Sequence, residues 1–112
     1  MNDENKLKSL LGIAKKAGKA ILGTDMTVEA IRGSKKKSVK LILVAKDASQ
    51  TTVKRINNTG CFYKIPVIVT AFDKGELAHI VGSQAELSVV GISDEGFAKA
   101  MIKTRENENG EF

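Results

Sequence analysis

The chain has 112 residues, 42% of them hydrophobic and 28% charged, as expected for one soluble globular domain spanning 1–112. Its longest apolar run has only five residues and its N-terminus is polar, which argues against a membrane span and a signal peptide. One cysteine excludes an intrachain disulfide and agrees with a cytoplasmic setting. Four Phe, one Tyr and no Trp argue against a broad base-stacking platform.

Charge is distributed unevenly along the chain. Residues 1–56 hold 13 Lys and Arg against 5 Asp and Glu, whereas residues 57–112 hold 5 against 8. A basic half joined to an acidic half predicts a one-sided electropositive surface, which suits a nucleic-acid partner. Lysines that only solubilise exposed helix faces would give the same balance, so charge alone leaves both interpretations open.

The N-terminal third predicts a helix, a short strand and a second helix. The first helix has apolar residues at the i, i+3, i+4, i+7 spacing: Leu7, Leu10, Leu11, Ala14. Gly18 is expected to end it, and an apolar strand follows over 20–22. Thr24 or Asp25 is expected to cap the second helix, and Gly33 to end it. Two of its residues are expected to face the core: Val28, Ile31.

The middle of the chain predicts two buried strands with a helix between them. Residues 41–45 are apolar without alternation, so both faces of that strand are expected to be covered. Ser49 is the expected cap of a helix that carries Val53 and Ile56 and ends near residues 58–60. Residues 67–69 are expected to form the second buried strand.

The last third predicts a helix with a strong start signal, then a strand and a final helix. Asp73 and Glu76 have the spacing of a capping box, and Phe72 and Leu77 that of a hydrophobic staple. Gly82 is expected to close this helix. A strand over 87–92 follows, and then an amphipathic helix marked by three residues: Phe97, Ala100, Met101.

Strands that alternate with helices indicate an α/β fold without repeats or linkers, followed by a polar tail, 106–112, that is expected to fray. In such folds the strand ends and the neighbouring helix N-termini form the expected binding edge. Three segments fall at such places: 23–26, 46–47 and 83–87.

The sequence offers no constellation for catalysis. His79 is the only histidine and Cys61 the only cysteine, which excludes the common zinc sites. We expect His79 on a helix surface and Cys61 as a small buried thiol. There is no P-loop pattern, and the glycine spacing does not fit a dinucleotide fingerprint. We therefore predict a binding protein that is not an enzyme and has no cofactor and no metal.

The clearest binding feature begins at Gly23. A glycine turn leads into a helix whose first N–H groups and partial positive charge suit an anionic ligand. After that helix come three adjacent lysines, whose mutual repulsion a polyanion would relieve: Lys35, Lys36, Lys37. A second cluster stands at the end of the first helix, where the helix dipole alone also favours cations: Lys15, Lys16, Lys19.

This order of features resembles the L7Ae/L30e superfamily of ribosomal proteins, which bind kink-turn RNA, and within it the bacterial YlxQ-like subgroup. The resemblance covers residues 6–105 and rests on five stretches: 10–19, the Gly-x-Asp-x helix start at Gly23, Ala-Ile-Arg-Gly at 30–33, Leu-Ile-Leu-Val-Ala-Lys-Asp-Ala at 41–48, and 94–98. It implies a three-layer α/β/α sandwich with a four-stranded mixed sheet. It also implies recognition of RNA by the start of the second helix and by the loop before the last strand.

The side chains that read the RNA bases in this family differ here. In the family pattern Gly-x-Asn-Glu-x-x-Lys, the glycine falls on Gly23, but Asp25, Met26 and Glu29 occupy the three polar positions that read sheared G·A pairs. An ionised Asp25 only accepts hydrogen bonds, Met26 offers apolar contact, and Glu29 repels phosphate. The resemblance thus predicts a retained scaffold with an altered base-reading surface.

The second family contact is an apolar loop that meets an extruded nucleotide. It falls on residues 85–88, where the usual proline is absent and the segment is one residue shorter than in the family pattern. Leu87 is equally well explained there as a core residue. The residues expected to contact RNA are Lys15, Lys16, Lys19, Gly23, Thr24, Asp25, Met26, Glu29, Arg32, Lys35, Lys36, Lys37, Lys46, Ala85, Glu86, Leu87 and Ser88.

Two functions follow from this pattern. The first is non-catalytic, ribosome-associated binding of structured RNA of kink-turn type, with ribosomal or other RNA-associated proteins as further partners. The alternative is a protein-interaction module on the same fold. Its partner would meet the acidic half, at Glu86, Asp94 and Glu95.

Overall fold

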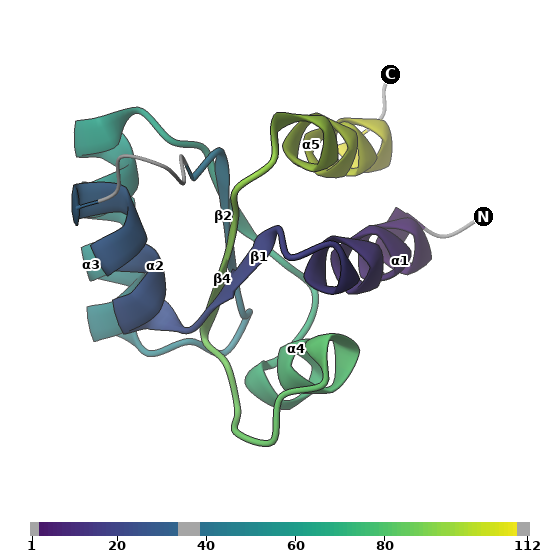
Figure 1. Ribbon diagram of the computed structural model, residues 1–112, viewed down its shortest axis with the longest axis horizontal. Helices are drawn as coiled ribbons and strands as arrows, with labels where there is room; N and C mark the ends of the chain where they lie inside the picture. Colours follow the sequence, from purple (N-terminus) through teal and green to yellow (C-terminus); the bar gives the residue numbers. More distant parts are fainter. Residues whose placement is uncertain (1–2, 34–38, 110–112) are drawn as a thin grey trace.

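The computed structural model describes residues 3–33 and 39–109, and in it helices alternate with strands (Figure 1). The elements are α1 (Asp3–Lys16), β1 (Ala20–Leu22), α2 (Thr24–Gly33), β2 (Leu41–Val44), α3 (Gln50–Tyr63), β3 (Val67–Val69), α4 (Lys74–Val81), β4 (Val89–Ile92) and α5 (Glu95–Asn109). Within these ranges no helix has both the length and the apolar character needed to cross a bilayer.

The strands form a four-stranded mixed sheet in the order β1-β4-β2-β3. β4 runs antiparallel to both β1 and β2, with Leu22 opposite Val90 and Val44 opposite Val89, whereas β3 is parallel to β2. The C-terminal ends of β1 and β2 therefore lie beside the first residue of β4. We call this side of the sheet the Gly23 edge, because Gly23 directly follows β1.

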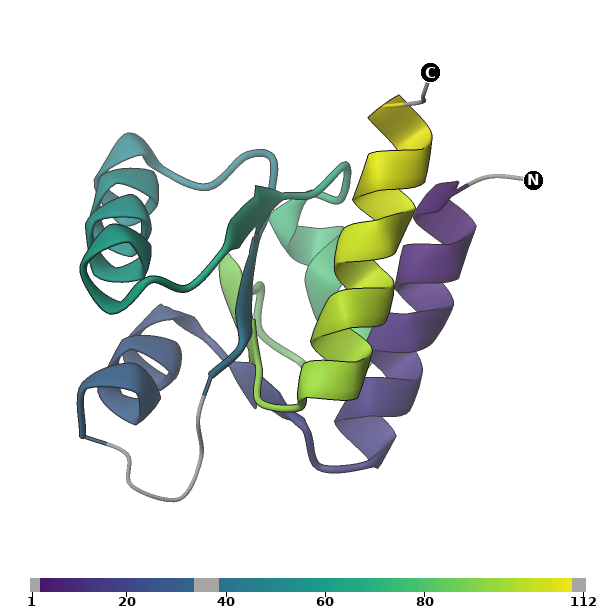
Figure 2. The same cartoon turned by 90° about the horizontal axis from the view of Figure 1, so that it is seen from above.

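Helices cover both faces of the sheet, with α2 and α3 on one side and α1, α4 and α5 on the other (Figures 1 and 2). Alternate residues of the central strand β2 face the two layers: Ile42 packs in the cluster with Val28 and Ile56, and Leu43 in the cluster with Leu11 and Met101. This confirms the predicted three-layer α/β/α sandwich and explains why β2 is apolar throughout.

Local start and stop signals define several helix ends as predicted. The Asp73 carboxylate accepts a hydrogen bond from the Glu76 N–H at 2.7 Å, and the Glu76 carboxylate accepts one from the Asp73 N–H at 2.9 Å, a complete capping box. The Ser49 hydroxyl accepts from the Thr52 N–H at 3.1 Å. Gly82 ends α4 in the left-handed conformation, with φ 73°.

The cap of α2 differs from the prediction of Thr24 or Asp25. The Thr27 N–H donates to the Gly23 carbonyl at 3.1 Å, so Gly23 occupies the cap position and Thr24 is already helical. Gly23 has φ 101°, a backbone conformation that glycine adopts without strain. The turn thus depends on the glycine backbone and not on a polar side chain.

The end of α3 also differs, because the helix continues past Gly60 to Tyr63 and stops at Lys64, with φ 60°. Gly60 is buried, and a Cβ there would lie 2.8 Å from the Ile65 carbonyl oxygen. This glycine allows the returning chain to approach the helix closely. Because Gly60 faces inward, its neighbour Cys61 is exposed, contrary to the expected buried thiol.

Two further features correct the sequence interpretation. β3 is an edge strand, paired only with β2, so its Val69 is exposed and the strand is not buried. β4 begins at Val89, because the Leu87 N–H donates to the Lys74 carbonyl of α4 at 3.2 Å and not to a strand. The final helix, α5, extends to Asn109.

Candidate nucleic-acid interface

The three segments expected at a binding edge do meet in space. The Gly23 N–H donates to the Val89 carbonyl at 2.9 Å, and the Ala45 N–H donates to the Ser88 carbonyl at 2.8 Å. The segment before β4 is therefore held between the ends of β1 and β2. The start of α2, the residues after β2 and the loop before β4 form one continuous Gly23 edge.

The start of α2 lies close to the sheet because one residue of β4 has no side chain. A Cβ on Gly91 would lie 2.9 Å from Cγ2 of Thr27, which is fully buried. The Thr27 hydroxyl also donates to the Ile21 carbonyl at 3.4 Å. These contacts position the start of α2, where the N–H groups of residues 24–26 precede the first intrahelical hydrogen bond and suit an anion.

The exposed side chains of this turn are those of Asp25 and Met26. Met26 is 59% exposed, one of the few large apolar residues at the surface of the described chain. Asp25 is paired: Nη1 of Arg55, on α3, donates to its Oδ1 at 2.8 Å. The pair lines a groove of about 520 Å³ between α2 and α3, together with Glu29 and Arg32.

Sequence reasoning missed Arg55. It lies 30 residues from Asp25, on a different helix, and no local pattern connects the two. The side chains are 46% and 88% exposed, so the ion pair stabilises the fold by at most about 1 kcal/mol. The ion pair matters for the local charge, because the Arg55 guanidinium of α3 lies beside the Asp25 carboxylate at the base-reading position.

The loop before β4 contributes fewer contacts than predicted. Ala85 and Glu86 are exposed, and the Ser83 hydroxyl shapes their turn by donating to the Ala85 carbonyl at 2.8 Å. Leu87 is only 8% exposed and belongs to the core cluster beneath α4, so it does not offer a side chain to a ligand. Ser88 is half-buried.

Lys46 is a lysine of the Gly23 edge with an exposed side chain. It directly follows Ala45, and its N–H donates to the Phe72 carbonyl at 2.8 Å while its side chain is exposed. The neighbouring Asp47 is used structurally, because its Oδ1 accepts from the Lys74 N–H at the start of α4, at 2.9 Å.

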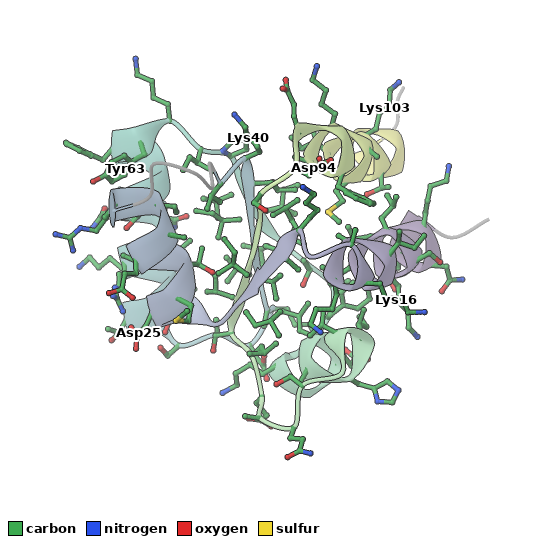
Figure 3. All side chains as sticks on the ribbon, in the orientation of Figure 1. Lys16, Asp25, Lys40, Tyr63, Asp94 and Lys103 are labelled. Atoms are coloured by element: carbon green, nitrogen blue, oxygen red, sulfur yellow. The ribbon has the colours of Figure 1, made fainter. Side chains whose placement is uncertain are left out.

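Other predicted contact residues lie elsewhere (Figure 3). Lys15 and Lys16 end α1, on the opposite face of the sheet from α2. The Lys19 carbonyl accepts from the Ser93 N–H at 2.9 Å, which places Lys19 at the edge opposite Gly23. Arg32 is in the last turn of α2, about 12 Å from the first by helix rise.

The lysine run 35–37 falls outside the described residues. Gly33, before the run, is the last residue of α2, and Lys40, after it, lies at the edge opposite Gly23, where its N–H donates to the Ile92 carbonyl at 2.7 Å. Asp25 and Lys40 mark the two opposite edges in Figure 3.

The acidic residues considered for a protein partner do not form one surface. Asp94 accepts from the Phe97 N–H at 2.9 Å and so holds the first turn of α5, and Glu95 pairs with Lys99 at 3.4 Å. Both lie beyond β4, at the edge opposite Gly23, whereas Glu86 precedes β4. The protein-interaction hypothesis therefore has no continuous acidic face in the described chain.

Comparison with known proteins agrees with the fold. The RNA-binding protein YlxQ of Enterococcus faecium is 37% identical over 108 residues, covering 95% of this chain and 96% of the relative. The large ribosomal subunit protein eL30 of Sulfolobus acidocaldarius is 33% identical over 98 residues, 88% of each chain. A solved structure of a Bacillus halodurans protein of unknown function superposes with a TM-score of 0.79, at 29% identity, over 88% of this chain and 95% of that one.

The two curated relatives are named as an RNA-binding protein and a protein of the large ribosomal subunit, which agrees with the expected absence of catalysis. Residues 5–102 match the family model described as ribosomal protein L7Ae/L30e/S12e/Gadd45. That match spans the Gly23 edge and all three layers of the sandwich. The chain therefore belongs to the ribosomal protein L7Ae/L30e/S12e/Gadd45 family.

Proposed function

We propose that this protein binds structured RNA at the Gly23 edge and catalyses no reaction. The observation that supports this most directly is the meeting of three separate segments at one edge, joined by the hydrogen bonds from Gly23 to Val89 and from Ala45 to Ser88. The relative YlxQ, 37% identical, is named as an RNA-binding protein, and its similarity covers this whole edge.

Within this function we propose that the RNA is of the kink-turn type. Backbone N–H groups at the start of α2 would hold phosphate, and Met26 would pack on a base or ribose. Asp25 would accept from an exocyclic amine or guanine N–H, with Arg55 offsetting its charge. Lys46 would contact phosphate. The Glu29 carboxylate would repel phosphate, so we expect weaker selectivity for kink-turn RNA than the family pattern provides.

The test compares two surface changes of equal charge. In one variant, Met26→Glu is combined with Lys46→Glu at the Gly23 edge. In the matched control, Ile13→Glu is combined with Lys103→Glu, because both residues are exposed and lie in the other helix layer. We expect the edge variant to lose at least about tenfold in affinity for a labelled kink-turn RNA, since it places repulsion and unpaired charge at the contact, and the control to lose little.

Fluorescence anisotropy would measure binding to the kink-turn RNA and to a duplex in which Watson–Crick pairs replace the G·A pairs. If both variants lost the same affinity for the kink-turn RNA, the proposal that RNA binds at the Gly23 edge would be contradicted. Equal affinity for the two RNAs would contradict the kink-turn proposal but not RNA binding itself.

We also propose that the natural RNA is ribosomal, because the relative eL30 is named as a protein of the large ribosomal subunit. Crosslinking followed by sequencing of the bound RNA would identify it. Recovery of unrelated RNA in place of ribosomal RNA would refute this part of the proposal.

A further inference from the structure

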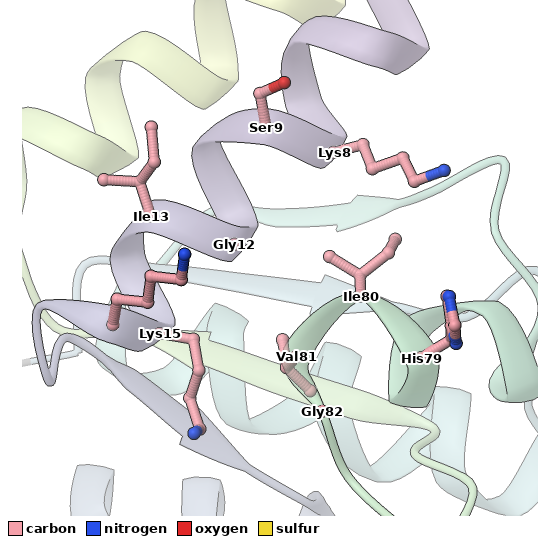
Figure 4. A pocket seen from close by; sticks show the side chains of 10 residues that line it. Lys8, Ser9, Gly12, Ile13, Lys15, His79, Ile80, Val81 and Gly82 are labelled. Carbon is pink, nitrogen blue, oxygen red and sulfur yellow. The ribbon is translucent and has the colours of Figure 1, made fainter.

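A second groove lies between α1 and α4, in the helix layer on the opposite side of the sheet from α2 (Figure 4). It has a volume of about 690 Å³. Lys8, Gly12, Ile13 and Lys15 line it from α1, and Ile80 is one of the residues that line it from α4. The Gly23 edge does not share any of these residues.

The groove is open because neither helix fills it. Gly12 contributes no side chain, and a Cβ built there would meet no atom within 4 Å. α4 is short and ends at Gly82. Ile13 is 54% exposed and Ile80 half-buried, so both leave apolar surface in contact with water. Covering that surface would be favourable for an apolar partner.

The charged side chains that line the groove are cationic. They are Lys8, Lys15 and Lys16, and the described residues of the lining include no carboxylate. The capping-box residues Asp73 and Glu76 line an adjoining pocket that shares Lys8 and Ile80 with the groove, and their carboxylates accept from backbone N–H groups. A ligand that fits must therefore combine apolar groups with negative charge.

We propose that this groove binds an acidic amphipathic segment of a partner protein. Its apolar side chains would cover Ile13 and Ile80, and its carboxylates would meet Lys8, Lys15 and Lys16. The span from Lys8 to Lys16 is about 12 Å of helix, which matches about two turns of a helix laid in the groove. A phosphate backbone would use the lysines but leave both isoleucines uncovered, so the apolar lining favours a protein segment over RNA.

The groove lies on the opposite side of the sheet from α2 (Figure 1), so a partner in the groove would leave the start of α2 open to RNA. The protein would then connect an RNA to a second protein. The groove proposal does not rest on the RNA proposal, since each uses different residues and has its own test.

The test uses a labelled 14-residue peptide with leucines on one helical face and glutamates elsewhere, and a matched peptide with glutamine in place of glutamate. We expect amide chemical shifts in NMR spectra to change at residues 8–16 and 79–82 with the acidic peptide only. Gly12→Gln should reduce the affinity for the acidic peptide at least about tenfold, because the new side chain would occupy the groove. Glutamine is a better helix former than glycine, so α1 should be retained.

Charge is tested with two triple variants. Lys8, Lys15 and Lys16 changed to Gln should weaken peptide binding about tenfold, whereas Lys6, Lys54 and Lys103 changed to Gln should leave it nearly unchanged. The proposal is overturned if the chemical shifts of the groove amides do not change, or if both triple variants lose the same affinity for the acidic peptide. It is also overturned if the glutamine peptide binds as tightly as the acidic peptide. It is also overturned if duplex RNA shifts the groove amides and displaces the peptide, which would make the groove a nucleic-acid surface.

Discussion

At the residue scale, the Asp25 carboxylate and the Arg55 guanidinium, 2.8 Å apart, change what the start of α2 can offer to a ligand. An isolated Asp25 would repel phosphate, but the pair is close to neutral. Arg55 uses one nitrogen for this contact, and its guanidinium has further donors in a fixed planar arrangement. Helix α3 thereby joins a surface that the sequence pattern assigns to α2 alone.

Arg55→Gln should therefore weaken binding of the kink-turn RNA by about tenfold, the effect of losing one charge-assisted hydrogen bond. It should also lower the slope of log affinity against log salt concentration by about 0.7–0.9, because one phosphate contact is lost. Lys54→Gln removes the same charge from the adjacent position and is the control. Anisotropy titrations at several salt concentrations would measure both, and equal slopes for the two variants would show that Arg55 makes no phosphate contact.

At the element scale, the position of α2 depends on its contact with β4. Gly91→Ala would place a methyl group 2.9 Å from Cγ2 of the fully buried Thr27, so either helix or strand must move. We expect a loss of about 1–3 kcal/mol in the free energy of unfolding, the usual cost of overpacking. Thr27→Ser removes the crowded methyl group but keeps the hydroxyl that bonds Ile21, so the double variant should recover part of the loss.

Urea unfolding of the wild type, both single variants and the double variant would measure this coupling. Strictly additive losses would contradict the proposed clash. The RNA affinity of Gly91→Ala should fall as well, because the displaced helix carries the N–H groups of the Gly23 edge.

Helix and strand boundaries that depend on neighbouring residues can be predicted from the sequence, whereas boundaries and burial that depend on tertiary contacts cannot. The capping box at Asp73 depends on residues three apart, and the structure has it as expected. The local sequence predicts a helix end near Gly60, because nothing local reveals that the chain returns against this glycine. The exposure of β3 follows from strand order, which no local pattern contains. At the site, Gly23 was found from its neighbours, whereas Arg55 needed the packing of α3 on α2.

At the scale of the whole molecule, lysines of the basic half of the chain lie at separate places on the described surface. Lys46 is at the Gly23 edge, Lys15 and Lys16 are in the groove, and Lys19 and Lys40 are at the opposite edge. Exposed charges more than about 8–10 Å apart are largely screened from each other at physiological salt. Each cluster therefore acts on a ligand mainly where the ligand touches it.

The lysine run 35–37 tests how far the RNA extends over the protein. Helix α2, which separates this run from Gly23 along the chain, has 10 residues and a length of about 15 Å, more than the screening distance. If RNA continues along α2 from the Gly23 edge, changing Lys35, Lys36 and Lys37 to Ala should weaken binding and lower the salt slope by about 2–3, because up to three phosphate contacts are lost. We expect this result, since the three lysines repel one another unless a polyanion is near. The same loss of charge at Lys6, Lys54 and Lys103 is the control. An unchanged salt slope in the 35–37 variant would confine the RNA to the Gly23 edge and leave the lysine run without a role in binding.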